Sequence, residues 1–137
     1  AALDLSPHSR AVLEWADFAA ADQHLHAYHA YHVPFAPRLE AYGLSSSAID
    51  VYSAQARSQC DAELAALVTS IRRAGVTSRM VERGDPTVLL RRYVESIRPS
   101  LVVLGKHVSG KRSSPVRHAG SVCRSITGSV SADVLVV

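Results

Sequence analysis

One segment of the sequence combines the residue types that bind anions. Residues 101–122 read LVVLGKHVSGKRSSPVRHAGSV and open on four aliphatic residues, a composition typical of a buried strand. Gly105 follows, then a loop rich in glycine, serine and basic residues, and Gly120-Ser121 precedes a final helical pattern. Free backbone N–H groups in a loop and at the start of a helix attract negative charge. The sequence therefore predicts an anion-binding site in this segment.

The charge of the chain points to the same place. Between Pro99 and Ala132 there is no Asp or Glu, and this segment carries a charge of +5, against +3 for the whole chain. The cationic residues are Lys106, Lys111, Arg112, Arg117 and Arg124. A basic patch confined to one segment favours a small anionic ligand over a long polyanion. Nucleic acid is the weaker candidate, because the chain has neither a recognition motif nor a set of aromatic platforms.

The glycines of this segment admit more than one interpretation. Backbone N–H groups at Gly110, Gly120 and Ser121 could hold a triphosphate, since glycine allows close approach. A surface turn that needs glycine for its geometry is the alternative. Residues 105–111 also read GKHVSGK, close to a P-loop, but Arg112 stands where a P-loop has the Ser or Thr that holds Mg²⁺.

Strand and helix patterns alternate along the chain and so predict the elements that position this segment. Leu3-Asp4-Leu5 has the pattern of a strand end, and Ser6-Pro7 that of a helix start, with Ser6 as N-cap. Helices are expected at about 7–21, 47–74 (closed by Gly75), 86–98 and 120–128. Strands are expected at 24–31, 76–82, 101–104 and 134–137, and a long loop at 33–46. Asp85 is expected to cap the helix that starts at Pro86.

In two helices the spacing of apolar residues predicts which side chains face inward. In the helix at 47–74, the residues that repeat with a helical period are Ile49, Tyr52, Ala56, Cys60, Leu64, Leu67, Val68 and Ile71. In the helix at 86–98, they are Val88, Leu89, Val94 and Ile97.

This alternation is typical of a single α/β domain over residues 1–137, a doubly wound parallel sheet with helices on both faces. Ligands of such sheets bind at the carboxyl ends of the strands. Asp4, at the end of the first strand, is therefore a candidate for a ribose or for a metal bound to phosphate; a carboxylate that caps the first helix is the alternative. The opening residues look like the end of a strand that begins earlier, so a truncated or longer parent chain is expected.

The remaining features of the composition narrow the function. No apolar run approaches the length of a membrane-spanning helix, and no signal peptide is evident. Cys60 and Cys123 are far apart, in no metal or redox spacing, and are expected to be buried or half-buried thiols in a reducing compartment. Four histidines fall in nine residues, but no cysteine or carboxylate lies near them, so edge histidines are favoured over a metal site. They are His24, His26, His29 and His32. No nucleophile–base pair or pair of catalytic carboxylates is apparent, so binding is favoured over catalysis.

Over nearly its whole length the sequence resembles the universal stress protein family. The resemblance rests on ALDLSPHSRAVLEWA at the start, HAYHVP, RGDP, LVVLGKH, and GSV followed by a terminal VLVV. It implies a Rossmann-like, five-stranded parallel sheet in the order 3-2-1-4-5. Nucleotide-binding members carry Gly-x-x-Gly, nine residues, then Gly-Ser or Gly-Thr. Here Gly105 matches the first glycine, and Val108 stands where the second is expected. Gly110, nine residues and Gly120-Ser121 complete the pattern if two residues are inserted.

The resemblance also implies roles for particular residues. Asp4, with Ser6 beside it, matches the acidic position near the nucleotide ribose, and Ala30 matches the position whose backbone contacts adenine. The phosphate-binding positions are Gly105, Lys106, Gly110, Gly120, Ser121 and Val122. The family commonly dimerises through its last strand, here Val134–Val137; an ordinary edge strand is the alternative.

Three hypotheses follow. The first is a cytoplasmic, homodimeric stress-response regulator that binds an adenine nucleotide, ATP, with Mg²⁺ as a possible companion. The second, which Val108 and the insertion favour, is a dimeric interaction module that has lost nucleotide binding. The third and weaker hypothesis is a slow nucleotide hydrolase or phosphotransferase, for which no general base is evident.

Overall fold

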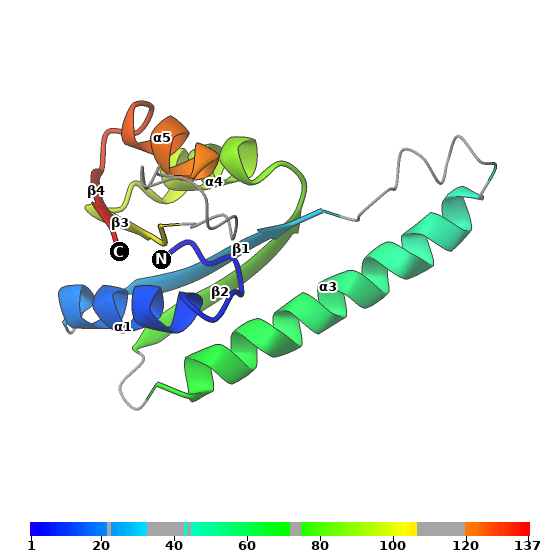
Figure 1. The fold of residues 1–137 in the computed structure, drawn as a ribbon, viewed down its shortest axis with the longest axis horizontal. Coiled ribbons are helices and arrows are strands. Elements are labelled where there is room, and N and C mark those ends of the chain that lie inside the picture. The colour runs from blue at the N-terminus through cyan, green and yellow to red at the C-terminus, as the bar shows by residue number, and fades with distance from the viewer. Residues whose placement is uncertain (22, 33–42, 44, 72–74, 107–119) are drawn as a thin grey trace, which may run out of the picture.

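Helices and strands alternate through the chain in the computed structural model, which describes residues 1–21, 23–32, 43, 45–71, 75–106 and 120–137 (Figure 1). The elements are α1 (Ser9–Ala20), β1 (Leu25–Tyr31), α3 (Ser46–Thr69), β2 (Val76–Arg83), α4 (Pro86–Ile97), β3 (Leu101–Leu104), α5 (Ser121–Thr127) and β4 (Asp133–Val136). Each of these helices and strands was predicted, with boundaries that differ by a few residues.

The strands form two parallel pairs, β1 with β2 and β3 with β4. Ala2 connects the pairs, because it makes parallel bridges both to Tyr28 of β1 and to Leu104 of β3. The Ala2 N–H donates to the Val103 carbonyl at 2.9 Å, and the Leu3 N–H donates to the Tyr28 carbonyl at 2.9 Å. The predicted first strand is thus present only as this bridging residue, and the described residues form four strands. The predicted alternation of helices with parallel strands is confirmed.

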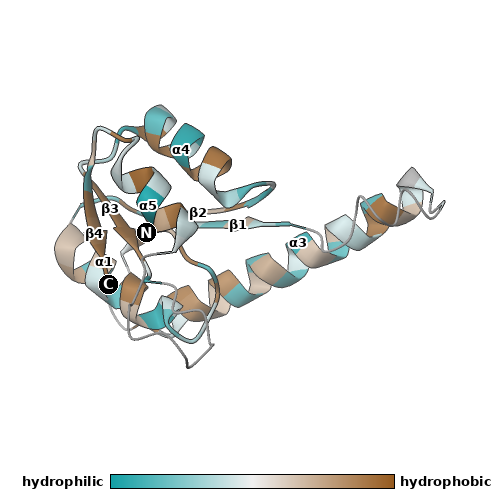
Figure 2. Cartoon of the chain, turned by 45° about the horizontal axis from the view of Figure 1, so that its top comes forward, coloured by the Kyte–Doolittle hydropathy of each residue, from teal (hydrophilic) through white to brown (hydrophobic). Residues whose placement is uncertain are grey.

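The helices cover both faces of the strands: α1 and α3 lie on one side, and α4 and α5 on the other (Figure 1). Because side chains alternate along a strand, Ala27 of β1 packs with the α1 and α3 cluster, whereas Tyr28 packs with α4 and α5. Burial is complete at the centre of each layer, as at Leu64 and Ile126, which are both 0% exposed. The aliphatic residues of β3 and β4 form a hydrophobic region in Figure 2.

Local chemistry explains one helix start as predicted and corrects another. Asp85 caps α4, since its Oδ1 accepts from the Thr87 and Val88 N–H groups at 2.9 and 3.0 Å. The prediction that Ser6 caps the first helix was wrong: α1 begins at Ser9, and its N-cap position is His8, which makes no side-chain cap. The reason is Leu5, whose left-handed φ of 58° turns the chain before the helix can start.

The α3 helix begins one residue earlier than predicted and ends earlier too. Ser45 is its N-cap and accepts from the Ala48 N–H at 3.3 Å. The prediction that Gly75 closes this helix was wrong, because the C-cap is Ser70. The Gly75 N–H instead donates to Asp17 Oδ1 at 3.0 Å, so it is tied to α1. Residues 33–42 and 44 of the predicted long loop lie outside the described residues.

Two side chains predicted to face inward are exposed. Tyr52 of α3 is 51% exposed and Val88 of α4 is 55% exposed. Ser53 and Leu90 are buried in their place, at 7% and 4% exposure. The Ser53 hydroxyl donates a hydrogen bond to the Ile49 carbonyl at 2.7 Å. A polar residue can therefore occupy this inward position, because its hydroxyl is not left unpaired.

Candidate functional site

A cavity of about 710 Å³ lies where β1 and β3 end. Seven of the predicted site residues line it: Asp4, Ser6, Ala30, Gly105, Gly120, Ser121 and Val122. Lys106 is described but does not line the cavity, and Gly110 lies outside the described residues. These residues come from four separate parts of the chain, and the structure brings them together at the carboxyl ends of parallel strands, where α/β sheets bind ligands.

Hydrogen bonds fix the carboxylate of Asp4 in this cavity. Its Oδ1 accepts from the Ser6 N–H at 3.0 Å and from the Ser9 hydroxyl at 2.8 Å. The left-handed Leu5 sets the turn that brings the Ser6 N–H back to Asp4. Asp4 therefore does not cap α1, as one sequence-based alternative held; it is held beside the start of that helix.

The end of β3 is fastened to its neighbours on both sides. The Cys123 Sγ donates to the Gly105 carbonyl at 3.2 Å, and the Lys106 N–H donates to the Val137 carbonyl at 2.8 Å. The backbone of Lys106 thus pairs with the chain after β4 rather than facing the cavity. Gly120 occupies the N-cap position of α5, and no side chain of a described residue caps this helix.

The cysteines are as predicted, and one of them belongs to the cavity. Both are free thiols; Cys60 is half-buried and Cys123 is buried. Burial raises the pKa of the Cys123 thiol, and the negative charge of Asp4 raises it further. Asp4 is therefore electrostatically coupled to the first turn of α5, across the cavity from α1.

Several residues that line the cavity were not predicted from the sequence. Among them are Ser9, His29, His32, Pro86, Leu90 and Cys123. Ser9 lies in the opening stretch that resembles the family, and Cys123 directly follows GSV. The sequence assigned neither residue a role, and the fold reveals their place. His29 is 7% exposed, and because a carbonyl only accepts, its Nδ1 donates to the Leu3 carbonyl at 2.8 Å. In the described part of the chain, no group of three or more His, Cys, Asp or Glu could hold a metal ion.

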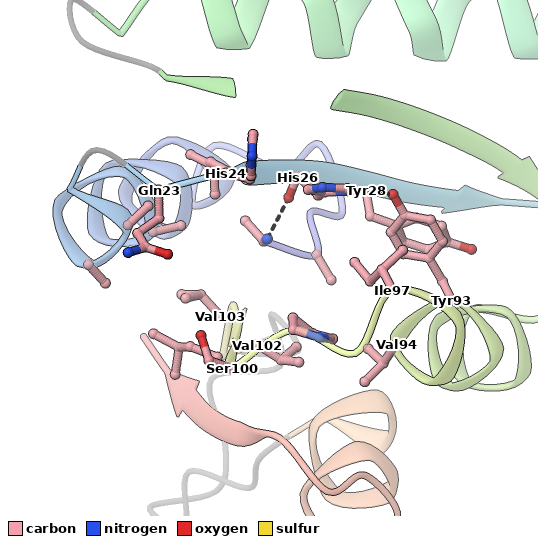
Figure 3. Close-up of a pocket in the computed structure, with 18 of the residues that line it drawn as sticks. Gln23, His24, His26, Tyr28, Tyr93, Val94, Ile97, Ser100, Val102 and Val103 are labelled. Carbon is pink, nitrogen blue, oxygen red and sulfur yellow. Dashed lines mark hydrogen bonds between the residues drawn. The ribbon is translucent and has the colours of Figure 1, made fainter. Parts of the chain in front are cut away.

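A second cavity of about 600 Å³ lies between β1, β3 and α4, near the amino ends of the strands (Figure 3). Two tyrosines stand at its α4 side: the rings of Tyr28 and Tyr93 stack with centroids 4.6 Å apart. The Tyr28 hydroxyl donates to Glu82 Oε2 at 2.7 Å, and Arg92 pairs with Glu82 at 2.9 Å. Burial, with Glu82 beside it, raises the pKa of Tyr28. None of the predicted site residues that the structure describes lines this cavity.

Comparisons with known proteins agree with this arrangement. The model of the universal stress protein family matches residues 1–137. The chain belongs to the universal stress protein family. A universal stress protein UspA from Lactobacillus plantarum has a similar solved structure, with 18% identity and a TM-score of 0.68, covering 99% of this chain and 93% of that one. A search of curated protein sequences finds no match.

Two further solved structures share the fold at 22% identity. One is a universal stress protein in complex with cAMP, with a TM-score of 0.55, covering 99% of this chain and 91% of that one. The other is a member of the family from Burkholderia pseudomallei, with a TM-score of 0.58 and the same coverage. These similarities establish an α/β Rossmann-like fold. No described helix of this chain is long and apolar enough to cross a membrane.

Proposed function

We propose that this universal stress protein binds an adenine nucleotide, ATP, in the cavity at the ends of β1 and β3. The observation that carries the proposal is the convergence of seven predicted residues on one cavity of about 710 Å³, although they come from four parts of the chain. A cavity of this volume is of the size that holds a small-molecule ligand. A relative solved in complex with cAMP supports an adenine nucleotide as the ligand class.

The chemistry of the cavity suits the parts of a nucleotide. Asp4 is a fixed hydrogen-bond acceptor for ribose hydroxyls, and the Ala30 backbone lies at the edge where adenine is expected. Glycine backbone at Gly105 and Gly120, with the Ser121 hydroxyl, offers donors and close approach to phosphate. Val122 lines the cavity beside them, and Lys106 and Gly110 belong to the proposed phosphate site on the family resemblance alone. Mg²⁺ would enter with the phosphates of ATP, since it is commonly held by phosphate oxygens and few protein ligands.

We further propose a regulatory role in which binding, rather than turnover, is the signal, in a cytoplasmic homodimer. In the sheet order of the family, 3-2-1-4-5, the first strand lies between the second and the fourth, which correspond to β1 and β3 here. The bridges of Ala2 to both of these strands agree with that order. β4 pairs with β3, and Val136 is 37% exposed, so Val134–Val137 offers a strand edge for a second copy. A dimeric interaction module without nucleotide binding is the second candidate, favoured by Val108 in place of the expected glycine.

Calorimetric titration of ATP tests the proposal with a pair of glycine variants. Gly120→Asp places a negative charge at the proposed phosphate site. The wild type is expected to bind ATP, and this variant is expected not to bind it. Gly128→Asp carries the same change at the other end of α5, outside the cavity, and is expected to bind normally. No binding by the wild type at millimolar ATP would refute nucleotide binding and favour the interaction module. Equal binding by all three proteins would place the ligand elsewhere.

A further inference from the structure

Ser9 is a buried polar residue whose hydroxyl serves another side chain. It is 1% exposed and is the first residue of α1. A serine at a helix start usually accepts a hydrogen bond from a free backbone N–H. Here the N-cap position belongs to His8, and the Ser9 hydroxyl donates to Asp4 Oδ1 at 2.8 Å. A hydroxyl buried this completely needs a partner, and Asp4 is the one it has.

We propose that Ser9 is a positioning residue that orients the Asp4 carboxylate to read the ribose of the nucleotide; this inference rests on the proposed function. The site would then select ribonucleotides over deoxyribonucleotides. Ser9 and Ser6 both donate to Oδ1, so one oxygen is held from two directions and the plane of the carboxylate is set. Charge-assisted bonds of this kind are short and directional.

Both donors stand on rigid supports. The Ser6 N–H belongs to the turn at Leu5, whose φ of 58° is a conformation that an L-residue holds only when its surroundings enforce it. Ser9 belongs to α1, which is anchored in the core by Val12 and Leu13 at 1% and 0% exposure. The carboxylate is thus presented by the body of the domain rather than by a loose side chain, which is what selective recognition of a hydroxyl requires.

The sign of the charge explains why orientation matters here. A carboxylate that reaches toward the phosphates repels them, whereas one that is held at the ribose accepts its hydroxyls. Removing the Ser9 hydroxyl takes away one of the donors that hold Oδ1 and loosens the orientation of the carboxylate. The loss is then expected in the part of the affinity that depends on the ribose hydroxyls.

The test compares ATP with 2′-deoxyATP and 3′-deoxyATP by calorimetry, for the wild type, Ser9→Ala and Ser53→Ala. The control, Ser53→Ala, also removes a buried serine hydroxyl, one that bonds to Ile49 and does not touch Asp4. The wild type is expected to prefer ATP over at least one deoxy analogue about tenfold. In Ser9→Ala this preference falls to about twofold or less, because ATP affinity drops while the affinity of that analogue hardly changes. Circular dichroism checks that each variant folds.

The outcomes separate this inference from the proposed function. A wild type that binds ATP, with an unchanged preference in Ser9→Ala, overturns the positioning role and leaves nucleotide binding intact. A wild type without preference between ATP and its deoxy analogues also overturns it. The same loss of preference in Ser53→Ala would show a general loss of packing instead. A wild type that binds no nucleotide refutes both statements.

Discussion

A side chain at Gly105, at the end of β3, is expected to lower the stability of the protein through packing alone. A Cβ built there would lie 3.0 Å from Val12 Cγ2 and 3.6 Å from His8 Cδ2. Its φ is not left-handed, so alanine fits the backbone itself. Val12 is 1% exposed and belongs to α1, so it has little room to move away. Gly105→Ala should therefore force α1 away from the end of β3.

The size of the effect follows from two opposing contributions. Overpacking in a close-packed core costs about 1–3 kcal/mol. Gly→Ala restricts the unfolded chain and returns about 0.4–1 kcal/mol. The midpoints of these ranges leave a net loss of about 1.3 kcal/mol of unfolding free energy. With an unfolding entropy of about 0.3 kcal/mol per kelvin for a chain of 137 residues, the Tm falls by about 4–5 °C.

Thermal unfolding of Gly105→Ala beside Gly128→Ala measures this. At Gly128, the C-cap of α5, the one neighbour that the described residues place near a Cβ is the Arg124 carbonyl oxygen, at 4.0 Å, and φ is an ordinary −99°. Its alanine variant should gain about 0.4–1 kcal/mol, so the two substitutions differ in sign. A Gly105→Ala protein as stable as the wild type would show that Val12 yields. The glycine would then have to be explained by the ligand rather than by α1.

Two further changes act on backbone conformation and on proton binding. Arg98 is the C-cap of α4 and lies in the left-handed region, with φ 44° and ψ 59°. Arg98→Gly should raise the free energy of unfolding by about 0.5–1 kcal/mol, measured by urea unfolding. Arg98→Ala keeps the strained Cβ and should not raise it. The raised pKa of Tyr28 means that the folded state keeps this proton after the unfolded state loses it. The stability of the wild type should therefore fall as the pH rises above about 10. Tyr28→Phe should be less stable by about 1 kcal/mol at neutral pH, but its stability should fall less steeply with pH. Urea unfolding at pH 8 and pH 10.5 measures both proteins, and an equal loss of stability in the two would contradict this.

Some signals within one element were interpreted correctly from the sequence, whereas errors arose where distant residues or an unusual backbone turn decide the structure. Asp85-Pro86 correctly predicted the start of α4, and the N-cap and C-cap of α5 are glycines at the expected positions. The end of α3 was missed because its apolar period runs on to Ile71, while Gly75 is held by Asp17, which is 58 residues away. Ser6-Pro7 has the pattern of a helix start, but the strained turn at Leu5 displaces the helix to Ser9. No local pattern reports that turn.

The candidate site divides in the same way. The glycines of the 101–122 segment and Asp4 carry motif signals, and the fold gathers them because β1 and β3 end on either side of Ala2. Ser9 and Cys123 carry no such signal. They join the site through contacts with Asp4 and Gly105, because α1 and α5 both begin beside those strand ends. The sequence departs from the family pattern at Val108, in the phosphate segment, whereas the hydrogen bonds from Ser6 and Ser9 to Asp4 are in place. If Val108 weakens binding, the loss should therefore fall on the phosphates, and recognition of the nucleoside should survive it.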